Sequence, residues 1–125
     1  MPMRFEIDGS YALVTCEGEF DMTGIEEIVE WIRTEEKLPE RFKLLILDRS
    51  TSFNPSTPQL SEVARLYGSV KERISSRWAL VVDKKLHYGI GRMYSVIAQD
   101  YGLDARVFAD IDEARAWLDS PRTQT

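Results

Sequence analysis

The most basic local group of this acidic chain lies directly after an apolar strand pattern, at the start of a predicted helix. Its members are Lys84, Lys85, His87, Gly89, Gly91 and Arg92. A helix N-terminus offers free backbone N–H groups, glycines let a ligand approach the backbone, and an arginine can bind an anion through two parallel hydrogen bonds. The group is therefore a candidate site for an anion or a lipid headgroup. An ordinary helix start, with solvated lysines and glycines packed on the sheet, is the alternative that the sequence favours.

Three large side chains, Tyr88, Met93 and Tyr94, follow in the same predicted helix. They could line an apolar pocket or form an interface, where tyrosine and methionine are enriched. The helical spacing of Met93 and Tyr94, which puts both on one face of this helix, favours packing in the core over either role.

Nothing in the chain pairs a nucleophile with a base. Cys16 and His87 are the only cysteine and histidine, and Cys16 lies in a strand pattern, which favours a small buried residue over a nucleophile. One cysteine and one histidine cannot form a zinc site without carboxylates. The sequence therefore predicts no catalytic residues, no metal and no cofactor.

The predicted elements are a strand pair, a first helix and then three strand–helix repeats. In order they are strands 3–8 and 11–18, helix 22–37, strand 43–48, a polar loop over 49–57, a helix that begins at 58, strand 77–82, helix 88–101, strand 105–108 and helix 110–118. Alternation of strands and helices implies parallel strands joined by crossovers. We therefore expect an α/β fold, ββαβαβαβα, with a five-stranded mixed sheet, an antiparallel N-terminal edge strand and four packed helices.

Several residues are suited to begin or end these helices. Thr23 fits a capping box for the first helix, although Asp21 could cap it instead, and Thr57 and Asp110 are suited to begin the second and fourth helices. Gly102 is a suitable stop for the third helix.

The length, apolar content and charge of the chain limit the classes of protein to which it can belong. With 125 residues we expect one domain over 1–119 and a frayed tail over 120–125. No window approaches the roughly 18 apolar residues of a membrane span, and no secretory signal is evident, so with a single cysteine we expect a cytoplasmic protein. The net charge is −5, and residues 17–36 hold eight acids against one base, which disfavours nucleic acid as a partner.

Four segments together carry a resemblance to a known family. They are the apolar strand 44–48 with its polar loop, 79–83, 89–94 and 107–118. With these segments the chain resembles the STAS-type fold of the anti-sigma-factor antagonists, and more closely the bacterial SpoIIAA-like proteins, labelled STAS/SEC14, whose role is unknown. The resemblance extends over nearly the whole chain and implies a fold rather than a reaction.

The resemblance also implies a position for a phosphorylation site. In the antagonists a serine within Asp-Ser-Ser-Gly, at a helix start after a strand that ends in Asp, is phosphorylated. Asp48 matches the strand end, and Ser56 and Thr57 lie at the matching helix start, but the Asp-Ser-Ser-Gly pattern is absent. Ser56 as a turn residue and Thr57 as a helix cap are the alternative that the sequence favours.

The sequence thus predicts a non-enzymatic regulatory or interaction domain that acts through protein partners or as a homodimer. The alternative is a small-ligand binder that holds an anion or lipid headgroup at the helix start from Gly89 to Arg92.

Overall fold

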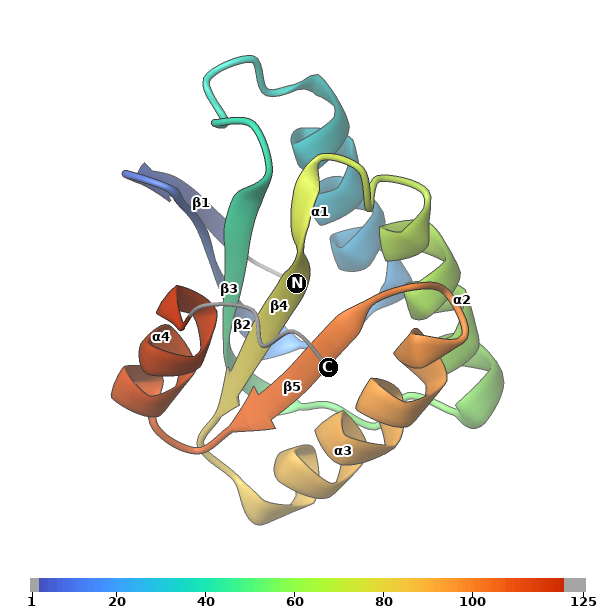
Figure 1. Cartoon of the computed structure of the whole chain (residues 1–125). Coiled ribbons are helices and arrows are strands. Elements are labelled where there is room, and N and C mark those ends of the chain that lie inside the picture. Colours follow the sequence, from blue (N-terminus) through green and yellow to red (C-terminus); the bar gives the residue numbers. More distant parts are fainter. Residues whose placement is uncertain (1–2, 121–125) are drawn as a thin grey trace.

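The computed structural model describes residues 3–120 and has one five-stranded mixed sheet (Figure 1). The strands are β1 (Met3–Asp8), β2 (Tyr11–Glu19), β3 (Phe42–Ser52), β4 (Ile74–Val82) and β5 (Asp104–Phe108). The helices are α1 (Met22–Thr34), α2 (Thr57–Gly68), α3 (Lys85–Gln99) and α4 (Ile111–Asp119). The strand order is β1-β2-β3-β4-β5, with β1 antiparallel to β2 and the other neighbours parallel. The predicted fold class, element order and antiparallel edge are confirmed.

The helices divide unequally between the two faces of the sheet (Figure 1). The buried residues of α1, α2 and α3 share one apolar core with one face, and α4 packs on the other face through Ala114 and Leu118. Alternate residues of β3 explain the division, since Leu44 belongs to the large core and Leu45 to the core under α4. The larger core, beneath three helices, is where an internal site can form.

β3 is longer than the sequence predicted. A polar loop was expected from Arg49, but the strand continues to Ser52 because β2 continues beside it, with Glu19 paired to Ser52. The N–H of Phe20 also donates to the carbonyl of Ser52 at 2.9 Å. Because alternate residues of a strand share a face, the extension places the side chain of Ser50 on the same face of the sheet as that of Asp48.

Two predicted helix starts were wrong by a residue or more. Ser56, not Thr57, caps α2: its hydroxyl accepts from the N–H of Gln59 at 3.2 Å, and the Gln59 side chain accepts from the N–H of Ser56 at 2.8 Å. α3 begins at Lys85 rather than 88, because the N–H of Tyr88 already donates to the carbonyl of residue 84.

The C-terminal ends of two helices also differ from the prediction, and the structure shows which residue caps α1. α1 ends at Thr34 rather than 37, and α3 ends at Gln99 rather than 101. Asp21 caps α1 by accepting from the N–H of Gly24 at 2.8 Å, so the Asp21 alternative holds over the Thr23 capping box. Asp110 caps α4, as predicted.

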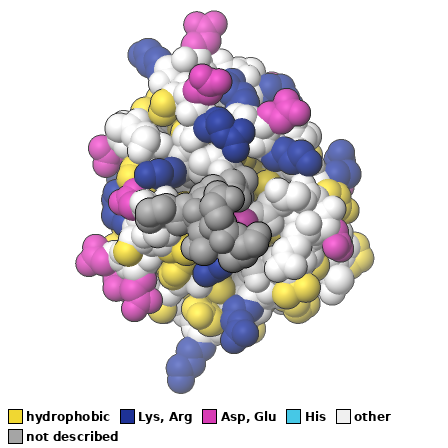
Figure 2. Space-filling model, viewed as in Figure 1, with side chains coloured by type: hydrophobic (Ala, Val, Ile, Leu, Met, Phe, Trp, Pro, Cys, Tyr) yellow, Lys and Arg dark blue, Asp and Glu magenta, His cyan; other side chains and the backbone are white. Residues whose placement is uncertain are grey.

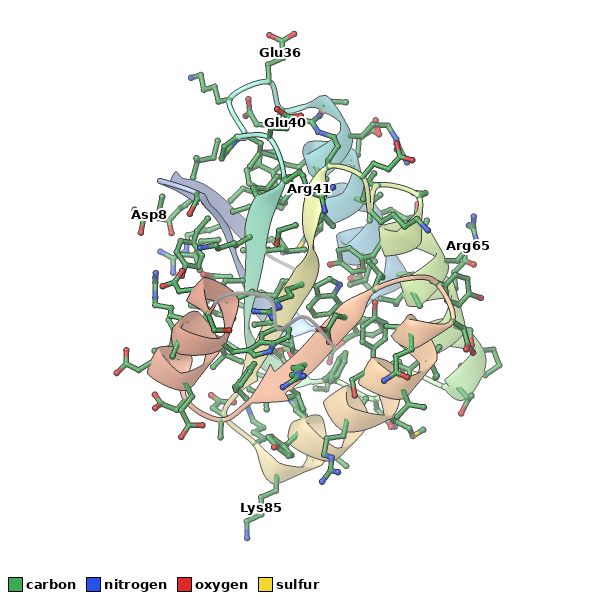
Figure 3. The ribbon with its side chains drawn as sticks, viewed as in Figure 1. Asp8, Glu36, Glu40, Arg41, Arg65 and Lys85 are labelled. Carbon is green, nitrogen blue, oxygen red and sulfur yellow. The ribbon has the colours of Figure 1, made fainter. Side chains whose placement is uncertain are left out.

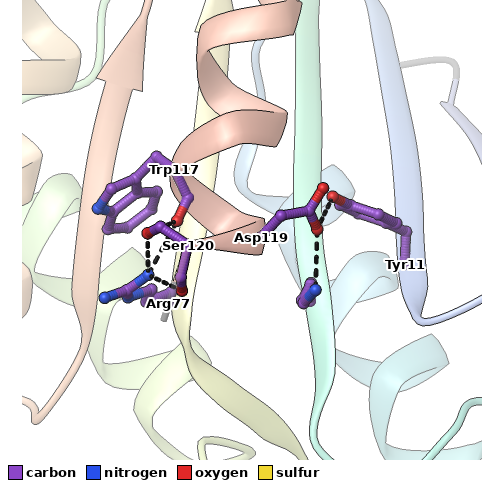
Figure 4. A network of polar contacts seen from close by, with 6 residues as sticks. Tyr11, Arg77, Trp117, Asp119 and Ser120 are labelled. Atoms are coloured by element: carbon purple, nitrogen blue, oxygen red, sulfur yellow. Dashed lines mark hydrogen bonds and ion pairs between the residues drawn. The ribbon is translucent and has the colours of Figure 1, made fainter. Parts of the chain in front are cut away.

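Polar contacts attach the end of α4 to the sheet (Figure 4). Asp119 accepts from the hydroxyl of Tyr11 on β2 and, at 2.8 Å, from the ammonium of Lys43 on β3. On β4, the guanidinium of Arg77 donates to the carbonyls of Trp117, at 2.8 Å, and Ser120, at 3.0 Å. Ser120, the first residue of the predicted frayed tail, therefore contacts the sheet through Arg77. The rest of that predicted tail, 121–125, lies outside the described residues.

Gly91 lets α3 lie close to the sheet. A Cβ at this position would lie 2.8 Å from Cγ2 of Val107 and 3.4 Å from Cδ2 of Leu80, whereas a Cβ at Gly89 would meet nothing within 4 Å. We expect Gly91→Ala to lower the free energy of unfolding by about 1–3 kcal/mol through overpacking. In the same helix, Gly89→Ala should raise it by up to about 1 kcal/mol, because alanine is the better helix former. Urea denaturation of both variants measures the difference, and equal effects would contradict it.

Within the described part of the chain, no helix has both the length and the apolar character needed to cross a membrane.

Candidate functional site

A buried polar cluster lies at the C-terminal end of β3. The two oxygens of Asp48 have separate partners: Oδ1 accepts from the hydroxyl and, at 3.0 Å, from the N–H of Ser50, and Oδ2 lies 3.0 Å from Nδ1 of His87. All three residues are buried, with 6%, 1% and 2% of their surfaces exposed. Buried polar groups are stable only when paired, and this cluster pairs them within the protein.

Two elements distant in the sequence build this cluster. Alternate residues of β3 put Asp48 and Ser50 on the face covered by α1–α3, and the early start of α3 brings His87 into its first turn. The ring of Phe53 lies edge-on to His87 with centroids 5.5 Å apart, and Phe20 lies edge-on to Phe53 at 5.2 Å. The two phenylalanines thus lie over the polar cluster.

A cavity of about 50 Å³ lies beside the cluster, between the sheet and the helices. Together with its opening to solvent, the hollow has about 550 Å³ of atom-free space. Its lining residues come from β2, β3, β4, the three helices and the loops after β2 and β3: Cys16, Phe20, Ile25, Ile28, Ile46, Asp48, Ser50, Phe53, Leu60, Val63, Tyr67, Trp78, Leu80 and Tyr94. The accessible wall is almost entirely apolar. The space exceeds the roughly 10–15 Å³ that one water molecule needs.

The cavity has a mouth and a deep end. Phe20 and Phe53 are the only lining residues that are not buried, so the cavity opens beside this pair of rings, beyond the C-terminal ends of β2 and β3. Val82 pairs with Asp48, and Trp78 precedes Val82 by four residues on β4, which is about 13 Å along a strand. Asp48 is therefore near the mouth and Trp78 at the deep end.

Three aromatic rings form a stack at the deep end. Trp78 on β4 lies between Tyr67 on α2 and Tyr94 on α3, with ring centroids 5.1 Å apart on each side. The two tyrosine hydroxyls and the indole N–H are buried, and none has a hydrogen-bond partner. Burial raises the pKa of both Tyr67 and Tyr94 well above the ordinary value. The nearby indole of Trp78 lowers the pKa of Tyr94 by a smaller amount, although the two groups do not meet hydrogen-bond geometry.

Cys16 lies in the cavity wall beside Asp48. Burial raises the pKa of its thiol to about 12, and the negative charge of Asp48 adds to the rise. A group whose pKa is raised on folding stays protonated up to that pKa, so the folded protein holds a neutral thiol at pH 8. We expect a thiol reagent to modify Cys16 at pH 8 only at the rate of unfolding, and at once in concentrated urea. Rapid modification of the native protein would contradict the buried, protonated thiol.

The polar cluster does not have the arrangement of a nucleophilic triad. In such a triad a histidine lies between the nucleophile and the carboxylate, whereas here Asp48 lies between Ser50 and His87. Within residues 3–120, no group of three or more His, Cys, Asp or Glu side chains is placed to hold a metal ion.

The structure separates the members of the predicted anion site. His87 and Gly91 are buried and face the core, whereas Lys85 and Arg92 are exposed, and Figure 3 shows Lys85 extending away from the molecule at the start of α3. The ammonium of Lys84 donates to the carbonyl of Ser50 at 3.0 Å and lies 3.4 Å from Asp83.

A shallow surface hollow does lie at this helix start. Lys84, Lys85, Tyr88 and Asp83 contribute to its lining, so a carboxylate stands beside the lysines. On the face seen in Figure 2, charged side chains of both signs are intermixed. The anion site remains a prediction.

The other predicted site residues also lie apart. Tyr94 lines the cavity, but Tyr88 and Met93 are exposed on the outer side of α3, with 36% and 46% of their surfaces accessible. The third helix was expected to bury Met93 with Tyr94, and this was wrong because the buried face of α3 runs through His87, Gly91, Tyr94 and Ala98. Ser56 and Thr57 are exposed at the start of α2.

Sequence reasoning missed the cavity and most of its lining. One signal was present: Asp48 and Ser50 are polar residues at alternate positions of one strand, which places both on one face. The pairing of this face with His87, and the meeting of Tyr67 with Trp78, depend on how helices pack, which no local pattern contains.

The comparisons with known proteins identify the fold. No family model and no curated protein matches the sequence. The structure is similar to the crystal structure of an uncharacterised protein from the DUF3478 family, with a SpoIIAA-like fold, from Shewanella loihica PV-4. The TM-score is 0.60 at 14% sequence identity, over 94% of this chain and 92% of the other. The resemblance that the sequence suggested is confirmed for the fold: the chain has a SpoIIAA-like fold.

Proposed function

We propose that this chain is a non-enzymatic, STAS-type binding domain that takes up a small, mostly apolar molecule in the cavity between Phe20 and Trp78. The observation that carries the proposal is the cavity itself, an apolar hollow in an otherwise packed core that opens at the C-terminal ends of the strands. Dry apolar cavities in protein cores bind small apolar molecules such as benzene and xenon.

The chemistry of the lining supports binding rather than catalysis. The thiol of Cys16 is protonated at neutral pH, and the Ser50 hydroxyl is fixed on the same carboxylate that binds His87. A nucleophile needs an adjacent base or a lowered pKa. In the lining, the pKa of Cys16 is raised, and Asp48 stands between the Ser50 hydroxyl and His87.

Xenon is the probe that tests the proposal, because it is small, apolar and uncharged. We expect xenon to shift the backbone amide signals of residues around the cavity, such as Ile28, Leu60 and Val63, and to leave those under α4 unchanged. Val63→Phe, which fills the cavity, should abolish these shifts. Val81→Phe, on the other face of the sheet, is the matched control and should retain them. Equal shifts over both cores, or none, would contradict the proposal.

A second candidate function is docking of a protein partner or of a second copy on the outer side of α3. Leu86, Met93 and Val96 follow one another at spacings of seven and three residues, and 66%, 46% and 66% of their surfaces are exposed. Exposed apolar groups of this kind are found at interaction sites. If this face mediates self-association, light scattering should show a dimer that Leu86→Glu converts to a monomer; a monomer at all concentrations would exclude the homodimer.

A further inference from the structure

We infer that the outer edge of β1 is a self-association surface, where two copies of the chain pair their β1 strands antiparallel about a twofold axis at Phe5. This edge of the sheet belongs neither to the cavity nor to the outer side of α3, so the inference goes beyond both proposed functions. It starts from an open edge strand whose sequence is complementary to itself.

β1 lacks the features that usually prevent an edge strand from pairing. It is the outermost strand of the sheet, and β2 is the strand beside it (Figure 1). Proteins commonly protect such an edge with lysine, proline or a β-bulge. Residues 3–8 contain no lysine or proline, and the pairing of β1 with β2 has no register shift. The outward backbone N–H and C=O groups of β1 can therefore pair with a second strand.

One face of β1 is apolar. Met3 and Phe5 pack against the large core, and the ring of Phe5 stacks on Trp31 of α1 at a centroid distance of 4.9 Å. Ile7 follows on the same face with 37% of its surface exposed. A strand placed beside β1 would cover this exposed side chain, which adds apolar burial to the backbone hydrogen bonds.

The other face of β1 carries two charges that the described chain does not pair. On β2, Arg4 lies opposite Thr15 and Glu6 lies opposite Leu13, and both charged side chains are exposed. No ion pair among residues 3–120 includes either of them. Both charges are therefore available to a partner strand.

The other edge strand of the sheet, β5, differs in this respect. Nε of Arg106 lies 3.8 Å from the carboxylate of Asp104, and the Arg106 guanidinium lies over the ring of Trp117, 4.8 Å from its centroid. The charges of β5 thus have contacts within the chain, whereas those of β1 do not. This contrast favours β1 as the edge that pairs.

The sequence of β1 supplies a complementary register for a second copy. In an antiparallel pair, side chains directly opposite each other lie on the same face, so a twofold axis between two identical strands passes beside one residue of each. With this axis at Phe5, Arg4 of each copy lies opposite Glu6 of the partner copy, and Met3 lies opposite Ile7 of the partner copy. Symmetry forms each contact twice.

Every other register of these strands opposes like charges. An axis at Arg4 or at Glu6 places that residue opposite its own copy, and an axis at Ile7 places Glu6 opposite Asp8. Opposite charges across a strand pair are stabilising, and like charges directly opposite are destabilising. The occupant that fits this edge is therefore a second copy of the chain in the Phe5 register, which joins the two sheets into one.

Charge reversal tests the inference, with sedimentation velocity over a range of protein concentrations as the measurement. A single strand pair is a small interface, so we expect a dimer that dissociates on dilution. Arg4→Glu and Glu6→Arg should each raise the dissociation constant about tenfold or more, because each turns both cross-strand pairs into like-charge pairs. Both positions are exposed, and circular dichroism should show that both variants are folded.

A mixture of the two variants tests the register itself. When the Arg4→Glu protein meets the Glu6→Arg protein, both cross-strand pairs again join opposite charges. The mixture should therefore form a heterodimer about as readily as the unmodified protein dimerises. The matched control is Leu86→Glu, which places a charge on the exposed side of α3 and should leave the dissociation constant unchanged.

Each remaining outcome would overturn the inference. A monomer at every concentration would do so, and so would a dimer that neither charge reversal weakens. A dimer that only Leu86→Glu weakens would assign self-association to α3 instead. Loss of the dimer in both charge variants without recovery in their mixture would reject the Phe5 register. None of these results affects the xenon test, so the proposed cavity function stands or falls separately.

Discussion

The Asp48→Ala protein should lose about 3–5 kcal/mol of its free energy of unfolding, because a buried donor left without its acceptor costs about 1–3 kcal/mol and this substitution affects several of them. The substitution leaves three buried groups without an acceptor: the N–H and the hydroxyl of Ser50, and Nδ1 of His87. Each would lose its hydration and gain nothing in exchange.

Urea denaturation measures this loss, and a second variant separates its causes. Asp48→Asn keeps an amide oxygen as an acceptor at the same place, so it should cost less than Asp48→Ala. Glu36→Ala, at an exposed position that extends from the molecule in Figure 3, should change stability by no more than about 0.5 kcal/mol. An Asp48→Ala protein as stable as the Glu36→Ala protein would show that the cluster contributes nothing to the fold.

Replacement of Trp78 by alanine should be about as costly, at about 3–5 kcal/mol, because it removes the central ring of the aromatic stack and leaves a larger cavity. Trp78 is 3% exposed and connects α2 to α3 across β4 through its contacts with Tyr67 and Tyr94. Loss of the ring therefore weakens the packing of both helices on the sheet.

Trp31 is a matched control for this second prediction. It is only half-buried on α1, and its main aromatic contact is with Phe5, at a centroid distance of 4.9 Å, so Trp31→Ala should cost clearly less. The cavity left by Trp78→Ala should also bind benzene, which would raise the melting temperature of this variant more than that of the unmodified protein. A cost no larger than that of Trp31→Ala, with no effect of benzene, would contradict the role of Trp78 in the core.

Most of the fold could be read from local patterns. The apolar strand that begins at Lys43, the stripe of Ile25, Ile28 and Ile32, and the cap at Asp110 each depend on residues close in sequence, and each predicted its element correctly. Alternation of these elements then determined a parallel sheet, because a strand–helix–strand unit returns the chain in the same direction.

The element ends were less predictable because they depend on neighbours. Arg49, Ser50 and Ser52 resemble loop residues in the sequence, yet they extend β3 because β2 offers backbone partners beside them. α3 begins before its apolar pattern indicated, because its first turn packs on the sheet: His87 is buried beside Asp48, and the N–H of Tyr88 donates to the carbonyl of Lys84.

The site was decided by the tertiary structure. The sequence grouped His87 with Lys85 and Arg92 because they are close in the chain, but a helix turns by about 100° per residue and carries neighbours to different faces. His87 therefore lies in the core beside Asp48, and Lys85 and Arg92 lie in solvent.

By itself the sequence determined the elements, their order and the sheet, because these follow from periodicity and caps within a few residues. Only the tertiary structure decided the cavity, its mouth at Phe53 and the unpaired donors around Trp78. The physical reason is that a cavity is the space that side chains from separate elements leave unfilled, and that space depends on the distances between packed helices and strands rather than on any segment of the chain.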